Sequence, residues 1–528
     1  MKQAARTLMV VGTASSVGKS LLVAALCRIC AQDGWRVAPF KAQNMSLNSF
    51  ATRDGKEMGR AQAMQAQAAG IEPTVEMNPI LLKPEADARS QVVAMGKPWA
   101  TLKAGDYYQH RDALWPIVTG ALDTLRAQYD LVIIEGAGSA VEPNFVSSDI
   151  VNMRVARYAN AVTLLAGDID RGGVFGALLG TLDLMSDEER ALVKGFIINK
   201  FRGDRNLLTP ALTFIEQRTN VPVLAVVPHL GTLRIADEDS VALETPIPRP
   251  LPPSRQQRGT GEGEQIPSPV PRPKRSRAEP HDQRDGGGLG WGSLIDIAVI
   301  RLPHIANFDD FDALALEDNV RVRFVASPAD LAQPDAIILP GSKTTIADLE
   351  FLNRTGLAMT IAARARRGAK VVGICGGYQM LGRVICDPLH VESEHDAVPG
   401  LNLLPVETIF EREKATEQVT ARVVADCGFL QSLVGQEIHG YEIHMGRTTG
   451  PSTSFGSAQD MGSGRRASPF LQITTRGERT VTDTDGAVDE TGHIFGTYLH
   501  GLFDNANFRR AWLNSLRPHA TSAQSLRD

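Results

Sequence analysis

The sequence predicts an α/β protein of two domains, the first of which contains a doubly wound parallel sheet. Three observations lead to this prediction. The chain has 528 residues, which is too many for a single hydrophobic core. Across the first part of the chain, short apolar runs alternate with amphipathic segments of helical length. Near residue 246 the composition changes abruptly to proline, glycine, arginine and serine, which predicts a linker between two domains.

The composition is that of an ordinary globular protein. Hydrophobic residues make up 43% of the chain, charged residues make up 22%, and the net charge is −5. This balance favours neither nucleic acid nor a membrane surface as a partner. Five cysteines, a short apolar start and the lack of an apolar run of about 18 residues predict a cytoplasmic protein without disulfides, a secretory leader or a membrane span.

We place the first domain at residues 1–245. Its apolar runs have the length and composition of buried strands, and the helical segments between them predict a parallel sheet that is covered on both faces. Ligands of such sheets bind at the carboxyl ends of the strands. The predicted strands are TLMVVGT (7–13), RVAPFK (36–41), YDLVIIEGAGS (129–139), AVTLLAGD (161–168), KGFIINK (194–200) and PVLAVVP (222–228).

Residues 246–292 are predicted to be a disordered linker, because so few apolar side chains cannot offset the entropy lost on ordering. A basic, proline-rich docking peptide is the alternative. The second domain is placed at 293–518. A helix is expected at 344–366 and a mobile loop at 450–469. The expected strands are 294–303, 321–327, 335–342 and 369–377, followed by more antiparallel segments at 400–411, 419–426 and 492–502.

A glycine-rich loop follows the first predicted strand and leads into a helix. Gly12 and Gly18 let backbone N–H groups approach phosphate oxygens, and the helix dipole adds positive charge there. Lys19 is placed to reach the outer phosphates, and Ser20 is placed to ligate Mg²⁺. A plain glycine-rich turn is the alternative. The spacing is unusual, because five residues separate Gly12 from the Gly-Lys-Ser triplet.

This longer loop resembles that of dethiobiotin synthetase and its relatives, which use ATP to convert a carboxylate into an acyl phosphate. The resemblance implies ATP contacts at Gly12, Thr13, Val17, Gly18, Lys19 and Ser20. It also implies an ATP-base contact at Asn199 and a metal-binding acid at Glu135. A second metal ligand is expected at Glu57, with Asp54 as its rival. Lys41 ends a strand on the phosphate side and is expected to neutralise charge on the transferred phosphoryl group. Solvated surface charges are the alternative for these side chains.

Cys375 lies between glycines in GICGG, directly after a predicted strand and before a helix. A sharp turn of this kind exposes a nucleophile, and the helix N-terminus favours the thiolate. A catalytic cysteine needs a base, and His500 ends a downstream apolar segment. The N–H groups of Gly341 and Gly376 are candidates for an oxyanion hole. A buried cysteine and a structural histidine are the alternatives.

Together these residues resemble a class I glutamine amidotransferase domain, which releases ammonia from glutamine through a cysteinyl thioester. Such domains usually carry an acid two residues beyond the histidine, and this chain has Leu502 there. Three alternatives remain open for the third role: Asp504, another acid, or a Cys-His dyad that works without a third member. An ATP-dependent carboxylate activator joined to a glutaminase predicts an amide synthetase that uses ATP, Mg²⁺ and glutamine.

Across both domains the chain resembles the cobyric acid synthase family of the cobalamin pathway. The motifs that carry this resemblance are FKAQNMSLNSF, GKEMGRAQAMQAQAA, MNPILLKP, LPGSKTT, GICGGYQMLG, GYEIHMGRT and GTYLHGLF. The resemblance implies a corrinoid substrate and amidation of the b, d, e and g carboxylates of adenosylcobyrinic acid a,c-diamide. Polar side chains that include Asn44 and Asn48 are then expected to face the corrinoid or the transferred phosphoryl group.

Three other functions remain as alternatives. Cobyrinic acid a,c-diamide synthase has both domain types in the same order. A nucleotide-switch adaptor would use the loop without the glutaminase, but Cys375 and His500 argue against it. A dethiobiotin-like synthetase with a regulatory tail would not consume glutamine. The sequence leaves the oligomeric state open.

Overall fold

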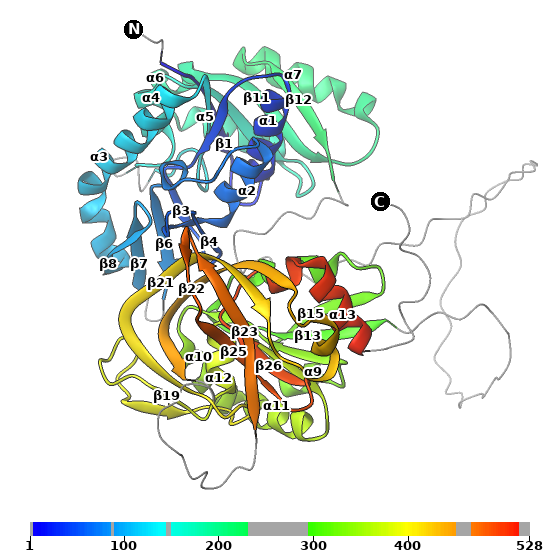
Figure 1. The fold of residues 1–528 in the computed structure, drawn as a ribbon. Coiled ribbons are helices and arrows are strands. Elements are labelled where there is room, and N and C mark those ends of the chain that lie inside the picture. Colours follow the sequence, from blue (N-terminus) through cyan, green and yellow to red (C-terminus); the bar gives the residue numbers. More distant parts are fainter. Residues whose placement is uncertain (1–3, 86–88, 144–148, 231–293, 450–465, 517–528) are drawn as a thin grey trace, which may run out of the picture.

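Two parts make up the protein, an N-terminal part (4–230) and a C-terminal part (294–516) that lies below it in Figure 1. The computed structural model describes residues 4–85, 89–143, 149–230, 294–449 and 466–516. The predicted linker at 246–292 and most of the predicted loop at 450–469 lie outside the described residues.

The N-terminal part is built on a six-stranded sheet in which neighbouring strands are parallel, with the order β12-β11-β10-β1-β9-β2. All six strands predicted from the sequence are present. They are β1 (Arg6–Gly12), β2 (Val37–Phe40), β9 (Leu131–Glu135), β10 (Val162–Asp168), β11 (Val193–Phe201) and β12 (Val223–Pro228).

Helices cover both faces of this sheet. Alternate side chains of the central strand, β1, therefore enter two different apolar clusters. Met9 and Val11 of β1 join one apolar cluster, whereas Val10 joins another that includes Leu22 and Cys27 of α1. The doubly wound prediction is confirmed. The helices are α1 (Lys19–Gln32), α3 (Ala104–Gln128), α4 (Met153–Ala159), α5 (Val174–Asp183), α6 (Asp187–Leu192) and α7 (Thr209–Thr219), with a 3₁₀ turn at Arg205–Leu208.

Between β2 and α3 the chain forms small elements that face the C-terminal part in Figure 1. The sheet β3-β6-β7-β8 and the pair β4-β5 were not predicted from the sequence; β3, β4 and β5 have only three residues each, too few for a periodic signal. These elements are β3 (Gln43–Met45), β4 (Ser49–Ala51), β5 (Glu57–Gly59), α2 (Arg60–Ala68), a 3₁₀ turn (Val75–Met77), β6 (Ile80–Pro84), β7 (Arg89–Ala94) and β8 (Lys97–Lys103).

The C-terminal part is built on a twelve-stranded mixed sheet. Its path runs β15-β13-β16-β18-β26-β25-β23-β21-β19-β20, with β22 beside β21 and β24 beside β23. The strands are β13 (Ile295–Ile300), β15 (Val320–Val325), β16 (Ala336–Leu339), β18 (Lys370–Ile374), β19 (Val384–Cys386), β20 (Ala397–Pro399), β21 (Glu407–Val423), β22 (Glu437–Thr449), β23 (Ala467–Arg476), β24 (Arg479–Thr480), β25 (Thr484–Asp489) and β26 (Ile494–Thr497).

Three sequence expectations for this part were wrong in detail. The helix expected at 344–366 is two helices, because Gly356 adopts a φ of 80° and ends the first. The strands expected at 400–411 and 419–426 merge into the single strand β21. The segment expected at 492–502 as antiparallel contains β26, which pairs antiparallel with β25 but in parallel with β18. It therefore joins the parallel half of the sheet to the antiparallel half.

Short elements surround this sheet. Its helices are α8 (Asp312–Ala315), α9 (Pro328–Leu331), α10 (Thr345–Thr355), α11 (Leu357–Arg366), α12 (Gly376–Leu381) and α13 (Ala506–Leu516). The pair β14 (Ile305–Ala306) and β17 (Gly341–Ser342) is antiparallel. The 3₁₀ turns lie at Phe308–Phe311, Gly428–Leu433 and Leu502–Asp504.

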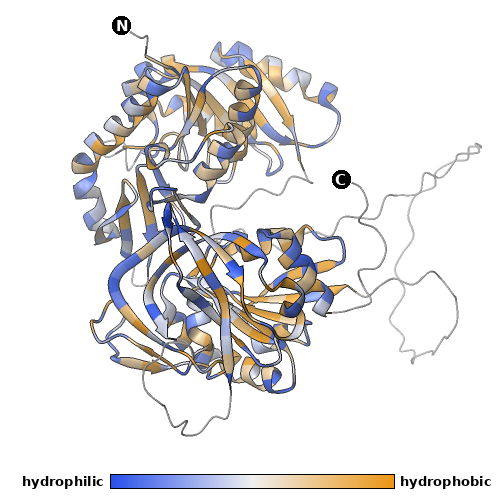
Figure 2. Cartoon of the chain, viewed as in Figure 1, coloured by the Kyte–Doolittle hydropathy of each residue, from blue (hydrophilic) through white to orange (hydrophobic). Residues whose placement is uncertain are grey.

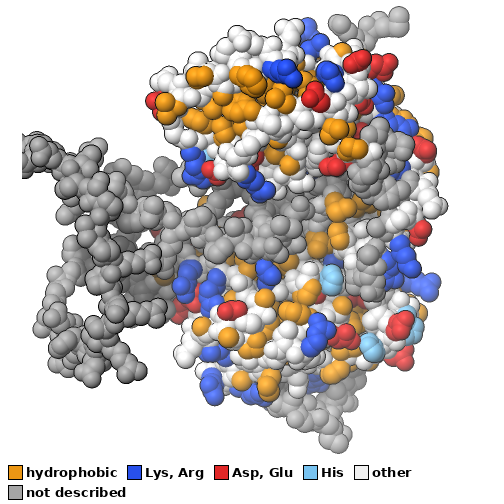
Figure 3. Space-filling view, turned by 180° about the vertical axis from the view of Figure 1, so that it is seen from behind, with side chains coloured by type: hydrophobic (Ala, Val, Ile, Leu, Met, Phe, Trp, Pro, Cys, Tyr) orange, Lys and Arg blue, Asp and Glu red, His pale blue; other side chains and the backbone are white. Residues whose placement is uncertain are grey.

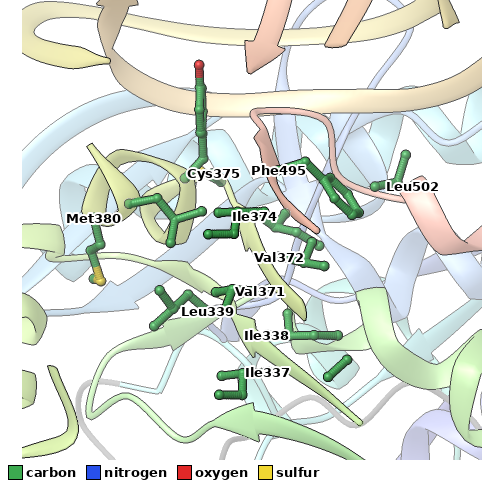
Figure 4. Close-up of a cluster of buried hydrophobic side chains, with 14 of the residues drawn as sticks. Ile337, Ile338, Leu339, Val371, Val372, Ile374, Cys375, Met380, Phe495 and Leu502 are labelled. Atoms are coloured by element: carbon green, nitrogen blue, oxygen red, sulfur yellow. The ribbon is translucent and has the colours of Figure 1, made fainter. Parts of the chain in front are cut away.

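Strands β18 and β16, which lead to Cys375 and Gly341, are among the most buried in the chain. Hydrophobic residues concentrate on the inner strands of both sheets (Figure 2). Side chains of β16 and β18 pack side by side below Cys375 (Figure 4), and they are Ile337, Ile338, Leu339, Val371, Val372 and Ile374. This packing fixes where the two strands end.

The surface is neither uniformly apolar nor uniformly charged. On the face shown in Figure 3, hydrophobic side chains gather on the N-terminal part, and charges of both signs are interspersed over the C-terminal part. Among the described helices, none is both long enough and apolar enough to cross a lipid bilayer.

Candidate functional sites in the two parts

The glycine-rich loop lies where the sequence places it, between the end of β1 and the start of α1. Gly18 has a φ of 96°, and a Cβ there would lie 2.3 Å from Nδ2 of Asn199. The Asn199 side chain donates to the carbonyl of Val17 at 2.8 Å. Asn199 therefore supports the loop in this structure, and its expected contact with the ATP base stays a prediction.

Lys19 is held over the same loop. Its Nζ donates to the carbonyls of Ala14 at 3.0 Å and Gly138 at 2.8 Å. The N–H of Thr13 donates to the carbonyl of Ala166, which ties the loop to β10. A lysine fixed at this point lies where the outer phosphates of a bound nucleotide are cradled in such loops.

Ser20, Lys41 and Glu135, three of the predicted residues, meet at one carboxylate. Oε1 of Glu135 accepts from Oγ of Ser20 at 2.8 Å and from Nζ of Lys41 at 2.9 Å. Burial raises the pKa of Glu135, but Lys41 and the hydrogen-bond donors around it outweigh burial and lower the pKa. The buried cluster is therefore a charged pair next to the phosphate loop.

Two glutamines of α2 complete the surroundings of Glu135, and the sequence analysis did not identify them. Gln65 donates to Oε2 of Glu135 at 2.6 Å and to the carbonyl of Ser20 at 3.3 Å. Gln62 lies 3.4 Å from the same oxygen. Their spacing of three residues in RAQAMQAQA, one helical turn, was the available signal.

The donor set at this cluster fits Mg²⁺. A serine hydroxyl and a carboxylate supply oxygen ligands, and Mg²⁺ usually keeps several waters and phosphate oxygens as its other ligands. Within the described residues, no group of three or more histidine, cysteine, aspartate or glutamate side chains could hold a metal ion. Ser20 and Glu135 supply two oxygen donors, so a metal held by them would need further ligands from water or a nucleotide.

Glu57, the second expected metal ligand, has lysine partners in this structure, and its role at a metal stays a prediction. One carboxylate oxygen accepts from Nζ of Lys83 at 2.5 Å, and the other is paired with Lys414 of the C-terminal part. Burial opposes the charge of Glu57, but the two lysines outweigh burial and lower its pKa. In the part of the chain that the structure describes, Glu57 hydrogen-bonds neither Ser20 nor Glu135, so it acts as an anchor between the two parts.

The two asparagines expected to face substrate also have partners inside the protein. Nδ2 of Asn44 donates to Oε1 of Gln62 at 3.2 Å. Asn48 is fully buried, and its Oδ1 accepts from the N–H of Phe308 in the C-terminal part at 3.2 Å. In this structure Asn48 therefore joins the two parts of the chain, and the expected contact of either asparagine with substrate stays a prediction.

Cys375 follows β18 and directly precedes α12. Its backbone has a φ of 51° and a ψ of −112°, a strained conformation that turns the side chain out of the sheet. The residue is 7% exposed and lines a cavity together with His500 and Gly341. The sequence-derived arrangement of a cysteine and a histidine at one cavity is present.

His500 is oriented by a carboxylate that the sequence did not reveal. Its Nδ1 lies 2.7 Å from Oδ2 of Asp310, and Oδ1 of Asp310 accepts from the N–H of Gly501 at 2.8 Å. Burial lowers the pKa of His500, but Asp310 outweighs burial, and Cys375 adds to its effect, so the pKa is raised to about 10. A proton taken from the Cys375 thiol is therefore stabilised on the imidazole.

Asp310 rather than Asp504 is the third member of this set. Asp504 has its pKa raised to about 6, mainly by burial, and no described hydrogen bond joins it to His500. Asp310 lies in the segment NFDDF, 190 residues before His500, so spacing around the histidine gave no indication of it. Only the pairing of β14 with β17 brings this segment to the end of β16.

The two glycines expected at the oxyanion hole lie beside Cys375 and His500. A Cβ on Gly341 would be 3.1 Å from Cε1 of His500, and a Cβ on Gly376 would be 3.0 Å from the N of Ser342. A side chain at either position would be crowded by these close approaches. Their role as donors to an oxyanion stays a prediction.

Both parts of the chain line the cavity around Cys375. Lys83 of β6 and Gln91 of β7 come from the N-terminal part, and Gln379, Lys414 and His444 come from the C-terminal part. The cavity around Cys375 is therefore completed by the part that carries the phosphate loop.

Models of known protein families match both parts of the chain. Residues 8–241 match the CobQ/CobB/MinD/ParA nucleotide binding domain, and residues 296–508 match the CobB/CobQ-like glutamine amidotransferase domain. Among solved structures, PurLQS from Thermotoga maritima aligns with 42% of this chain and 100% of its own at 20% identity and a TM-score of 0.31, a likeness too slight to carry an argument.

Curated relatives match almost the whole chain. A cobyric acid synthase of Dehalococcoides mccartyi strain CBDB1 is 49% identical over 515 residues, which cover 98% of this chain and 92% of that protein. A cobyric acid synthase of Moorella thermoacetica is 48% identical over 514 residues, which cover 97% of this chain and 89% of that protein. With this identity over nearly its full length, the chain belongs to the cobyric acid synthase family, whose members are amide-forming ligases with a glutamine amidotransferase domain.

Proposed function

We propose that this enzyme uses ATP and glutamine to amidate the b, d, e and g carboxylates of adenosylcobyrinic acid a,c-diamide, giving adenosylcobyric acid. The observation that supports this most strongly is the position of the Cys375 cavity. Cys375 and His500 line it, Asp310 holds His500 from behind, and Lys83 and Gln91 of the part with the phosphate loop line it as well. A glutaminase pocket lined by both parts of the chain supports a reaction that passes ammonia from one part to the other.

In the glutaminase half of the proposed reaction, the Cys375 sulfur attacks the side-chain carboxamide carbon of glutamine. His500 takes the thiol proton and then gives it to the departing ammonia, while Asp310 holds the imidazole in place. Water hydrolyses the resulting thioester to release glutamate. The N–H groups of Gly341 and Gly376 are proposed to bind the negative oxygen of each tetrahedral intermediate.

In the synthetase half, a substrate carboxylate oxygen attacks the γ-phosphorus of ATP, and ADP leaves. Ammonia then attacks the acyl phosphate, and inorganic phosphate leaves as the amide forms. Lys19 and Lys41 are proposed to stabilise the negative charge on the transferred phosphoryl group. Ser20 and Glu135 would hold Mg²⁺, which supplies further charge neutralisation at the phosphate oxygens.

The division of labour can be tested with two nitrogen sources. Cys375→Ala should lose amidation driven by glutamine and keep amidation driven by ammonium salt. Lys19→Ala should lose both, because both need the acyl phosphate. A folded Cys375→Ala variant that is inactive with ammonium would contradict separate glutaminase and synthetase sites. Assays of cobyrinic acid and of its a,c-diamide as substrates distinguish this enzyme from an a,c-diamide synthase.

The domain boundaries belong to the same proposal. We place the synthetase domain at 1–245, a linker at 246–292 and the glutaminase domain at 293–518. Limited proteolysis tests them, since cleavage is expected to concentrate between 246 and 292.

A further inference from the structure

Helix α2 (Arg60–Ala68) touches both sites. At its first residue, Nε of Arg60 lies 2.8 Å from Oδ2 of Asp309 in the C-terminal part. Two and five residues further along, Gln62 and Gln65 lie against Glu135 beside the phosphate loop. A single helix of nine residues thus contacts the glutaminase at one end and the ATP site along its length.

The segment that Arg60 contacts is the one that orients the catalytic histidine. Asp309 is directly followed by Asp310, which holds Nδ1 of His500 at 2.7 Å. Two residues earlier, Nδ2 of Asn307 lies 3.2 Å from Nε2 of the same imidazole. Residues 307–310 therefore contact both nitrogens of His500.

The N-terminal part holds this segment at three consecutive residues. Oδ1 of Asn307 accepts from the N–H of Ser49 at 2.8 Å, and the N–H of Phe308 donates to Asn48 at 3.2 Å. Asp309, the third, pairs with Arg60. The segment has little freedom of its own, since Asn307 adopts a φ of 51° and the following residues form a 3₁₀ turn.

Charge makes Arg60 the most consequential of these contacts. Asp309 and Asp310 are adjacent carboxyl groups, 7% and 3% exposed, and Arg60 is the cation paired with the first of them. Burial raises the pKa of Asp309, Arg60 opposes this shift, and Asp310 adds to it. Without the guanidinium, a buried carboxylate would lose its counter-charge right beside the residue that orients His500.

The other end of α2 is equally well connected. Gln65 hydrogen-bonds both Glu135 and the backbone of Ser20, the two residues that would hold Mg²⁺. Any shift of Ser20 and Glu135 when a nucleotide binds therefore acts on α2 directly. Because a short helix moves as a rigid unit, its first residue would move too.

We propose that Arg60 is a positioning residue for the glutaminase and that α2 couples the ATP site to His500 through Asp309 and Asp310. Glutamine hydrolysis would then be fast only when α2 holds the 307–310 segment as it does here. The inference rests on the proposed function and extends it by naming the element through which the ATP site controls ammonia release.

The test compares Arg60→Gln with Arg60→Lys and with a matched control, Arg53→Gln. Arg53 also makes an ion pair between the two parts, with Glu478 at 3.2 Å, but both of these side chains are largely exposed, whereas Arg60 pairs with the buried Asp309. Four quantities are measured for each variant: kcat and KM for glutamine hydrolysis, the stimulation of hydrolysis by ATP plus corrinoid, amidation from ammonium salt, and Tm.

Arg60→Gln is expected to lower glutaminase kcat by about tenfold to a hundredfold, with KM for glutamine nearly unchanged, because His500 is displaced while the pocket remains. Stimulation by ATP plus corrinoid should be lost, and amidation from ammonium should be retained. Arg60→Lys should recover part of the rate, and Arg53→Gln should resemble the wild type in all four quantities.

Arg60→Gln combined with Asp309→Asn tests whether the two residues act together. The double variant should be no slower than the slower single variant, because the same interaction is removed in each. Additive losses would show that Arg60 does not act through Asp309.

A folded Arg60→Gln variant with normal kcat and normal stimulation would overturn the inference. Equal losses of glutaminase kcat in Arg60→Gln and Arg53→Gln, each in proportion to the fall in Tm, would overturn it too. Such losses would mean that both arginines only hold the two parts together. If Arg60→Gln does not fold, the same criteria apply to Arg60→Lys. Failure of the proposed function is a different result, namely wild-type enzyme that neither hydrolyses glutamine nor amidates the corrinoid.

Discussion

Nδ1 of His500 lies 2.7 Å from Oδ2 of Asp310, although the two residues are 190 positions apart in the chain. Both side chains are buried, and the second oxygen of Asp310 accepts from the N–H that follows His500. The carboxylate therefore orients the imidazole and holds its Nδ1, so that Nε2, which also lies 3.2 Å from Nδ2 of Asn307, is the nitrogen proposed to exchange a proton with Cys375.

Replacing Asp310 tests this relationship. Asp310→Asn keeps the size of the side chain but removes the charge, so the imidazolium loses its stabilisation and the favoured tautomer changes. We expect glutaminase kcat to fall by about 10²- to 10⁴-fold, with ammonium-driven amidation retained. Asp504→Asn is the matched control and should change kcat by less than about threefold. A larger loss in Asp504→Asn than in Asp310→Asn would return the third role to Asp504.

The contrast between these two aspartates illustrates what the sequence could and could not reveal. Cys375 was identified because a strand, a nucleophile between glycines and a helix are adjacent in sequence and form one local turn. Asp310 depends on a tertiary contact, since a two-residue pair of strands, β14 with β17, carries its segment to the active site. No local pattern specifies that contact.

The same distinction applies to the N-terminal part. The six sheet strands were predicted because buried parallel strands are long apolar runs, and the residues at their carboxyl ends, Lys41 and Glu135, converge as expected. Glu57, on the three-residue strand β5, and Asn48, just before β4, instead have partners in the other part of the chain. Their partners Phe308 and Lys414 are more than 200 residues away in the sequence.

The pair of Lys41 and Glu135 predicts separable effects on activity and stability. Lys41→Met should abolish amidation from both nitrogen sources, because charge on the transferred phosphoryl group is no longer neutralised. It should also lower the free energy of unfolding by about 3–5 kcal/mol, since Glu135 remains as a buried, unpaired charge. Combining Lys41→Met with Glu135→Gln should restore much of the stability and none of the activity. Denaturant titration and the amidation assay measure the two effects, and stability unchanged in Lys41→Met would contradict the buried pair.

His444 predicts a pH dependence of stability. It is stacked on Tyr498 with ring centroids 3.7 Å apart, and burial lowers its pKa to about 4. The unfolded chain binds a proton at this residue near pH 6.5, and the folded chain does so only near pH 4. Its contribution to stability is therefore fully present above pH 6.5 and is lost as the pH falls toward 4.

The difference between wild type and His444→Asn isolates this group. The wild type should lose up to about 3 kcal/mol more than the variant between pH 6.5 and 4, measured by urea unfolding at each pH. A difference that stays constant over this range would mean that His444 titrates alike in the folded and unfolded chains.

The position of Glu57 predicts that it does not take part in metal binding. Its two oxygens are paired with Lys83 and Lys414, so Glu57→Gln leaves two buried ammonium groups without a counter-charge. We expect a loss of about 3–5 kcal/mol in the free energy of unfolding. The Mg²⁺ concentration needed for half-maximal ammonium-driven amidation should remain that of the wild type.

Glu135→Gln, in contrast, should raise that concentration, because one of the two oxygen donors beside the phosphate loop loses its charge. If Glu57→Gln raised the Mg²⁺ requirement as much as Glu135→Gln, then Glu57 would have to leave its two lysines during the reaction, and the junction between the two parts would have to open with it.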